Sequence, residues 1–205
     1  MKKLGVFGGT FNPPHIGHLQ LAQELKKKLK LDEVLIIPDR LPPHKNAPDT
    51  APEHRLAMAR LAFKGYTVSD LELKREGKSY TADTLDTLAG QYPDTTLYLI
   101  CGSDMFYTLG KWHDPKRIFS RAIIATGARR TMEYWKLYCY KLFYALRFGA
   151  RCRVCRIKPL PLSSSQIRQG ERNKADIRAW VTPEVYHYIQ EQKLYDGEND
   201  EQIIF

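Results

Sequence analysis

Short apolar runs alternate with amphipathic stretches along most of the chain. Each of five runs is bounded by turn-forming residues, as buried strands commonly are: "LGVFG", "EVLIIP", "TVSDLEL", "TLYLICG" and "RAIIATG". Strands that alternate with helices favour β-α-β units. We therefore predict an α/β fold, a Rossmann-like, doubly wound, mostly parallel sheet with helices on both faces.

The first helix has the clearest pattern. Apolar residues recur at steps of three and four, at Ile16, Leu19, Ala22, Leu25 and Leu29. The lysines of "ELKKKLK" stand near its C-terminus, where positive charge complements the helix dipole. Further helices are predicted over residues 52–63, 81–92, 163–174 and 182–195. Thr81 is expected to cap the one that begins there.

Two segments are open to more than one interpretation. Residues 38–52 form a long Pro-rich stretch, and loops of that length in compact domains are usually functional or disordered. Residues 130–150 are aromatic, basic and compatible with a helix. Such a helix could pack its aromatics on the sheet, form a contact in a homo-oligomer or lie on a membrane surface.

Length and composition fit one domain over residues 1–205, with a small helical part at about 163–195. A chain of 205 residues with 43% hydrophobic residues can bury a core of its own. The N-terminal apolar run is too short for a secretory signal, and no run reaches the roughly 18 apolar residues of a membrane span. We expect a soluble, cytoplasmic protein that does not bind membranes.

Four cysteines give a weak chemical signal. Only Cys152 and Cys155 have C-x-x-C spacing, and zinc would need a second ligand pair at comparable spacing. The stretch "RCRVCRI" also alternates as a strand would. We expect reduced thiols and no metal site made by the protein alone.

The net charge of +9 is concentrated in one block. Residues 120–175 hold 13 Lys and Arg against two acids, while the rest of the chain holds 19 against 21. A local basic excess fits polyphosphate ligands, an acidic partner or RNA. Charge alone therefore leaves the ligand open.

The stretch "GGTFNPPHIGH", which follows the first predicted strand, contains residues suited to binding phosphate. Gly8 and Gly9 allow a phosphate to approach the backbone, and Thr10 adds a hydroxyl. His15 and His18 stand three residues apart at a helix start, so we expect them to project from one face of that helix. There they could donate to phosphate oxygens. A structural His pair or part of a metal site are the alternatives.

A second stretch, "LSSSQIR", also offers hydrogen-bond donors to phosphate. Serines that open a helix offer hydroxyls and amides to a triphosphate, and Arg168 offers a fork of donors. Taken alone, this stretch would also fit a capped surface helix.

Together the two stretches resemble the paired signatures of a nucleotidyltransferase superfamily built on a Rossmann-like sheet, the second usually written I-S-S-T-x-I-R. The resemblance implies catalytic roles for His15, His18 and Arg168, and ATP with Mg²⁺ as nucleotide substrate and metal. The ATP-binding residues that it implies are Gly8, Gly9, Thr10, Phe11, His15, His18, Gly102, Asp104, Ser163, Ser164, Ser165, Ile167 and Arg168.

The intervening residues resemble the bacterial nicotinate-nucleotide adenylyltransferases over most of the chain, in "LPPHK", "GKSYTADTL" and "CGSDMFYTLGKWHDP". This implies transfer of AMP from ATP to nicotinate mononucleotide, without nucleic acid. The implied acceptor-binding residues are Lys45, Ser79, Tyr80, Thr81, Thr84 and Trp112. A relative acting on nicotinamide mononucleotide or phosphopantetheine is the nearer alternative, and a non-enzymatic RNA-binding protein the more distant one.

The chain departs from that resemblance over residues 130–156. The family usually has a shorter segment there that opens with an Arg-Pro-Gly turn; this chain keeps an Arg as Arg129 or Arg130 but lacks the Pro. The departure affects oligomeric contacts and the far wall of the pocket more than the chemistry.

Overall fold

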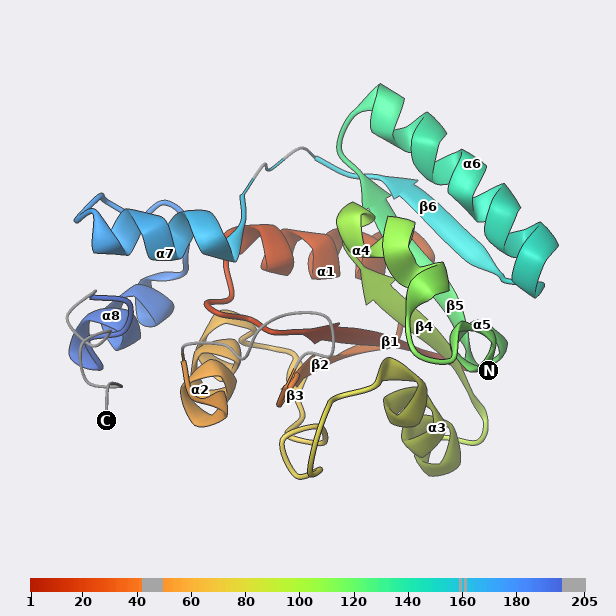
Figure 1. Cartoon of the computed structure of the whole chain (residues 1–205), viewed down its shortest axis with the longest axis horizontal. Helices are drawn as coiled ribbons and strands as arrows, with labels where there is room; N and C mark the ends of the chain where they lie inside the picture. Colours follow the sequence, from red (N-terminus) through yellow and green to blue (C-terminus); the bar gives the residue numbers. More distant parts are fainter. Residues whose placement is uncertain (42–49, 159, 161, 197–205) are drawn as a thin grey trace.

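The computed structural model of the protein describes residues 1–41, 50–158, 160 and 162–196. Within these residues, six strands form a sheet in the order β3-β2-β1-β4-β5-β6 (Figure 1). The strands are β1 (Lys2–Gly9), β2 (Glu33–Pro38), β3 (Thr67–Val68), β4 (Thr95–Cys101), β5 (Ala122–Ala128) and β6 (Cys152–Arg156). All neighbouring strands run parallel, so the predicted α/β fold is confirmed.

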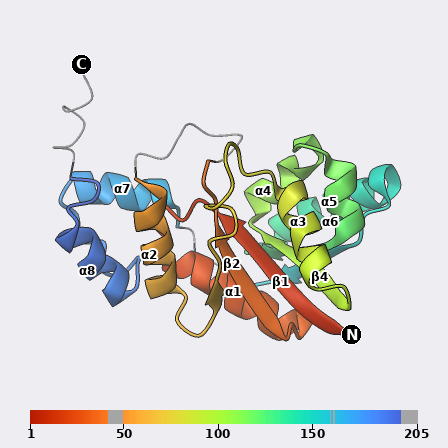
Figure 2. The ribbon, with the colours of Figure 1, turned by 90° about the horizontal axis from the view of Figure 1, so that it is seen from below.

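Helices cover both faces of this sheet, as Figures 1 and 2 show from two directions. One core receives side chains from α1 (Ile16–Leu29), α2 (Pro52–Ala62), α7 (Ser164–Arg172) and α8 (Pro183–Glu191). The other receives them from α3 (Thr81–Gln91), α4 (Ser103–Thr108), the 3₁₀ turn η1 (Leu109–Lys111), α5 (Pro115–Arg121) and α6 (Thr131–Phe148). Within the described part of the chain, none of the helices combines the length and apolar character needed to cross a bilayer.

The continuous apolar runs follow from this two-sided cover. Along β2, Val34 and Ile36 face one core, while Leu35 and Ile37 face the other. A strand buried on both faces has no polar side, so "EVLIIP" lacks the alternation of a half-exposed strand.

Two local predictions are wrong. The strand expected over "TVSDLEL" ends after Val68, where the Ser69 hydroxyl accepts a hydrogen bond from the Leu71 amide and turns the chain out of the sheet. Thr81 does not cap α3. Tyr80 is the N-cap residue, without a side-chain cap bond, and Thr81 is the first helical residue.

The strand order creates a position for a ligand. β1 lies between β2 and β4, so the chain leaves β1 toward one edge of the sheet and later returns to its other side. In open parallel sheets, ligands bind outside the carboxyl ends of the strands at such a reversal. The turns that follow β1 and β4 meet there, and both carry predicted site residues.

Candidate active site

The turn after β1 is held by a buried aromatic anchor. Phe11 adopts a left-handed backbone with φ of 48°, and its ring packs edge-on against Phe7 and Phe63. A Cβ on Gly9 would lie 3.0 Å from the Phe11 ring, which explains the glycine at this position. Because the Phe11 ring is buried, this residue can reach a ligand only through its backbone.

His15 and His18 form a stacked pair. Their ring centroids lie 3.7 Å apart with the planes inclined by 26°. His15 differs from the prediction in one respect: it precedes α1 as the N-cap residue with extended backbone, so only His18 projects from the helix itself. The His15 amide donates to Nδ1 of His18 over 3.3 Å. A neutral His18 ring therefore carries its proton on Nε2.

Burial fixes the charge state of His15. Its side chain is 5% exposed, and desolvation, followed by the positive charge of Arg129, lowers its pKa to about 4. His15 is thus neutral at pH 7. Its Nδ1 is buried and has no hydrogen-bond partner among the described residues. A Cβ on Gly17 would lie 3.0 Å from that atom, so the glycine leaves room for the ring.

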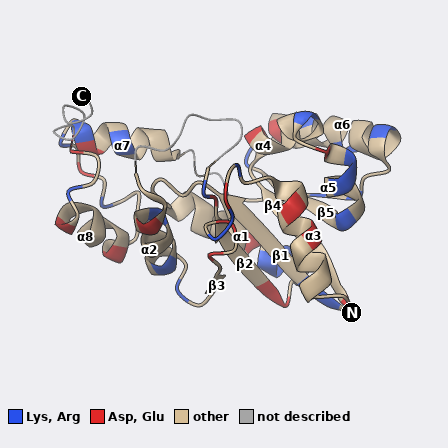
Figure 3. Cartoon of the chain, turned by 60° about the horizontal axis from the view of Figure 1, so that its bottom comes forward, with Lys and Arg blue, Asp and Glu red and all other residues tan. Residues whose placement is uncertain are grey.

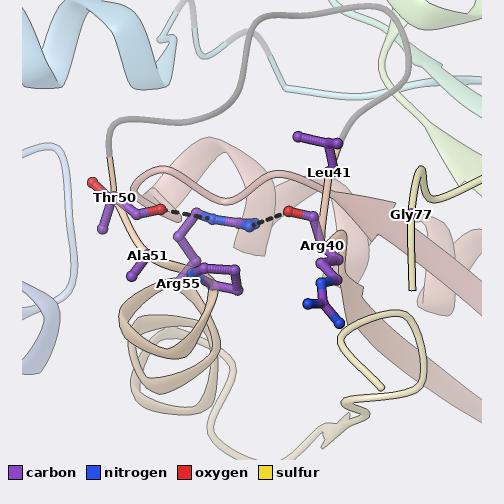
Figure 4. Close-up of a pocket in the computed structure, with 7 residues that line it drawn as sticks. Arg40, Leu41, Thr50, Ala51, Arg55 and Gly77 are labelled. Atoms are coloured by element: carbon purple, nitrogen blue, oxygen red, sulfur yellow. Dashed lines mark hydrogen bonds between the residues drawn. The ribbon is translucent and has the colours of Figure 1, made fainter. Parts of the chain in front are cut away.

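The Thr10 hydroxyl is positioned by a buried ion pair. It donates to Asp39 over 2.8 Å, and Asp39 in turn pairs with Arg55 at 3.1 Å. The Arg55 side chain is fully buried and also donates to the carbonyl oxygens of Thr10, Asp39, Arg40 and Thr50. Figure 4 shows its guanidinium between the Thr50 and Arg40 carbonyls, beside a cavity of about 280 Å³. Arg55 therefore ties the ends of two strands to α2.

The second predicted stretch docks onto the first. Nη1 of Arg168 donates to the Asn12 carbonyl over 2.7 Å, and the Ser164 hydroxyl donates to the Pro13 carbonyl over 2.8 Å. Tyr195, beyond α8, donates to the Asn12 side chain over 2.6 Å. Segments more than 150 residues apart thus meet beside the His pair.

The serines at the start of α7 differ in their surroundings. Ser163 is exposed and caps the helix, accepting from the Gln166 amide, while Gln166 accepts from the Ser163 amide in return. Ser165 is exposed and accepts a long 3.4 Å hydrogen bond from Arg168. Ile167 is fully buried, so its side chain holds α7 in place and only its backbone could meet a ligand.

At the end of β4, Gly102 is the N-cap residue of α4. A Cβ on Gly102 would lie 2.7 Å from an Asp104 carboxylate oxygen, so this side chain folds back over the glycine. Both residues stand at the carboxyl edge of the strand beside β1. The structure therefore brings them to the same edge of the sheet as Gly8 and Gly9.

The residues predicted to bind the acceptor lie around the start of α3. Ser79 is buried and accepts from the Arg40 amide, and Tyr80 faces His113 at a ring distance of 4.2 Å. Trp112 is half-buried, and its indole N–H donates to the Thr108 hydroxyl. Lys45 lies outside the described residues.

Thr84 is more deeply buried than the other described residues that are predicted to bind the acceptor. It is 2% exposed, and its hydroxyl donates to buried Glu72 over 2.6 Å while accepting from Arg75. Burial raises the pKa of Glu72 above its ordinary value, although the hydrogen bond from Thr84 opposes this effect. The Thr84 hydroxyl therefore supports the loop before α3. Thr81, at the first position of α3, is partly exposed.

The C-x-x-C cysteines cannot act as a pair. Cys152 belongs to one core, whereas Cys155 packs at the edge of the other, on the opposite face of β6. Among the described residues, no group of three or more His, Cys, Asp or Glu side chains could hold a metal ion.

The sheet is parallel, paired imidazoles stand at its first turn, and a helix that begins with serines and contains Arg168 docks beside them. These features together are typical of a nucleotide-binding protein. Residues 6–170 match the cytidylyltransferase-like family, and the chain belongs to this family.

Curated relatives align over nearly their whole length. The chain is 37% identical to a probable nicotinate-nucleotide adenylyltransferase of Oceanobacillus iheyensis, covering 95% of this chain and 97% of that protein. It is 38% identical to one of Bacillus cytotoxicus, covering 96% and 100%, and 38% identical to one of Geobacter sulfurreducens, covering 94% and 98%.

Solved structures share the fold. Nicotinic acid mononucleotide adenylyltransferase of Plasmodium falciparum, complexed with NaAD, superposes with a TM-score of 0.78 at 20% identity, covering 96% of this chain and 98% of that one. A putative nicotinate-nucleotide adenylyltransferase of Vibrio parahaemolyticus gives 0.67 at 22% identity, covering 95% and 96%.

Proposed function

We propose that the protein transfers AMP from ATP to nicotinate mononucleotide, giving nicotinate adenine dinucleotide and pyrophosphate in NAD biosynthesis. The observation that carries this proposal is the contact of Arg168 and Ser164 with the Asn12 and Pro13 carbonyls. It brings the donors of both signatures to one edge of the sheet. The names of the curated relatives support nicotinate mononucleotide as acceptor.

In the reaction, a 5′-phosphate oxygen of the acceptor attacks the α-phosphorus of ATP in line. The new P–O bond forms as the bond to the bridging oxygen breaks, and pyrophosphate leaves with that electron pair. The attacking phosphate is already an anion, so no general base is needed. Catalysis then depends on positioning and on stabilising negative charge.

The geometry suggests how the side chains divide this work. His18 would donate from Nε2 to the α-phosphate and its transition state, since Nδ1 accepts from the His15 amide. His15 and Thr10 would contact the phosphates. Arg168 and Ser164 would hold the β- and γ-phosphates, with Arg168 also attached to the turn.

The remaining predicted residues would bind the two substrates. Gly8, Gly9, Phe11, Ser163, Ser165 and Ile167 would form the backbone and hydroxyl surroundings of the triphosphate, and Gly102 with Asp104 would contact the nucleoside. Ser79, Tyr80, Thr81 and Trp112 would form the acceptor side, and buried Thr84 would support it from within through Glu72. Lys45 would reach the phosphate of the acceptor. We expect residues 1–205 to act as one domain in the cytoplasm.

Mg²⁺ is expected to accompany ATP. Because the described residues provide no cluster of three or more metal-ligating side chains, the ion would take most of its ligands from phosphate oxygens and water. Bound in this way, Mg²⁺ would neutralise charge on the phosphates.

A panel of acceptors with ATP tests the proposal. Pyrophosphate release is measured with nicotinate mononucleotide, nicotinamide mononucleotide and phosphopantetheine at equal concentrations, and nicotinate mononucleotide should give the highest kcat/KM. Faster reaction with phosphopantetheine would move the protein to another branch of the superfamily. Salt-sensitive RNA binding without pyrophosphate release would favour the RNA-binding alternative.

A further inference from the structure

Helix α6 has two apolar sides. Its inner side packs against β5 and β6, and Leu137 and Tyr144 on this side are fully buried. The Tyr144 hydroxyl donates to the Phe106 carbonyl over 2.7 Å and accepts from the Gly110 amide, so its polar atom is satisfied. The inner side therefore accounts for how α6 joins the fold, and leaves the outer side to be explained.

The outer side has large apolar residues that are exposed to solvent. Leu146 is 90% exposed, Met132 79% and Trp135 56%, and Leu142, Phe143 and Tyr138 are also exposed. We call these six residues, with exposed Cys139 at their centre, the α6 crest. Exposed apolar patches of several hundred Å² on a single chain usually mark an interaction surface.

Within the crest, the spacing is that of a helix-helix seam. Five of its members follow one another at alternating steps of three and four: Met132, Trp135, Cys139, Leu142 and Leu146. This seven-residue repeat keeps one narrow stripe on one side of a helix, where a second helix can pack along it. The pattern runs through nearly all of α6.

The cations of α6 lie beside the crest and contact aromatic rings of the same chain. Lys136 stands over Tyr107 at 4.6 Å, Lys141 over Tyr138 at 5.2 Å and Arg147 over Phe148 at 5.2 Å. In Figure 3, the blue of Lys and Arg appears at separate places along α6. The five residues of the stripe itself carry no charge, so two copies of the stripe can meet without burying a cation.

From these observations we infer that the α6 crest joins two copies of this chain in a symmetric dimer, with the helices antiparallel. A two-fold axis lets one apolar stripe meet itself, and an antiparallel pair sets the N-terminus of each helix dipole near the partner's C-terminus. If a full aromatic side chain presents roughly 150–250 Å², the crest offers on the order of 600 Å² per copy. Two copies would bury about 1,200 Å², at the lower limit of stable interfaces.

Sedimentation of the full chain tests this inference independently of the enzymatic activity. The wild type should have a mass of about 47 kDa, twice its 23.7 kDa. Leu142→Glu and Leu146→Glu each place a carboxylate in the apolar seam and should each give the monomer. Tyr92→Glu, at an exposed tyrosine at the end of α3, is the matched control and should leave the dimer intact.

Cross-linking locates the contact. Cys139 is the ninth of the eighteen residues of α6, so the two copies of it should lie near the two-fold axis. A short bismaleimide should join wild-type chains and fail to join Cys139→Ser chains. A wild type that stays monomeric at every concentration, or a dimer that survives both glutamate variants, would overturn the inference. So would a monomer that co-sediments with phosphatidylserine vesicles through the crest, since the occupant would then be a membrane.

Discussion

The guanidinium of Arg168 donates a hydrogen bond to the backbone carbonyl of Asn12, 2.7 Å away. One side chain thereby links the turn after the first strand to a helix near the end of the chain. The link uses one arm of the guanidinium, while the second arm contacts Ser165. Each terminal nitrogen has two N–H groups, so a single Arg can hold the two signatures together and still present in-plane donors to phosphate.

Arg168→Lys keeps the charge and removes this fork. A lysine ammonium is a point donor and cannot hold the Asn12 carbonyl and a phosphate with the same geometry. We expect KM for ATP to rise roughly tenfold, about 1.4 kcal/mol, with little change in KM for the acceptor. Steady-state kinetics with each substrate varied in turn measures the effect. Arg172→Lys, one turn further along α7, should leave both constants near wild type.

His18→Ala should lower kcat far more than it changes either KM. Loss of one donor to the transition state costs on the order of 3 kcal/mol, about a hundredfold in rate, because charge on the α-phosphate is left unstabilised. His187→Ala, at an exposed histidine on α8, controls for the substitution itself. Near-normal turnover of the His18 variant would remove this residue from the chemistry.

Trp112→Ala should weaken acceptor binding selectively. The indole is half-buried, and the next residue, His113, faces Tyr80 at the start of α3. Loss of the indole should raise KM for nicotinate mononucleotide roughly tenfold. KM for ATP should change little. Trp112→Phe keeps a flat apolar ring and should recover most of the affinity. An unchanged acceptor KM in the Ala variant would place Trp112 outside the pocket.

Most of the fold could be predicted because the sheet is buried on both faces. The apolar runs at β1, β2, β4 and β5 all predicted strands, and the periodicity of α1 predicted that helix. The short helices α4 and α5 have too few turns to show such a pattern and were not predicted. The early end of β3 could not be predicted, since the strand composition of "TVSDLEL" continues past Val68, where the Ser69 hydroxyl accepts from the Leu71 amide. A side chain that competes for a backbone amide leaves little trace in a hydrophobic pattern.

Supporting residues of the site were missed for a related reason. Asn12, Asp39 and His113 act through contacts made by distant segments, and nothing in the local sequence pattern distinguishes them from their neighbours. The position of Arg55 did give a signal in the sequence. Arg55 precedes Met58, Ala59 and Ala62 by three, four and seven residues, so it lies on the buried stripe of its helix. A charged residue on such a stripe predicts a buried partner, here Asp39.

His15 should make the protein less stable in mild acid. In the folded state its pKa is about 4, whereas an unfolded histidine titrates near 6.5. Between these values the unfolded chain binds more protons, so the free energy of unfolding rises with pH in this window and falls as pH decreases through it. From pH 7 to pH 5 the loss attributable to His15 is about 2 kcal/mol. Urea unfolding at both pH values, compared between wild type and His15→Gln, measures it. The Gln variant should lose less stability by that amount, while His187→Gln should follow the wild type. Equal losses in wild type and His15→Gln would show that His15 is not held neutral by burial.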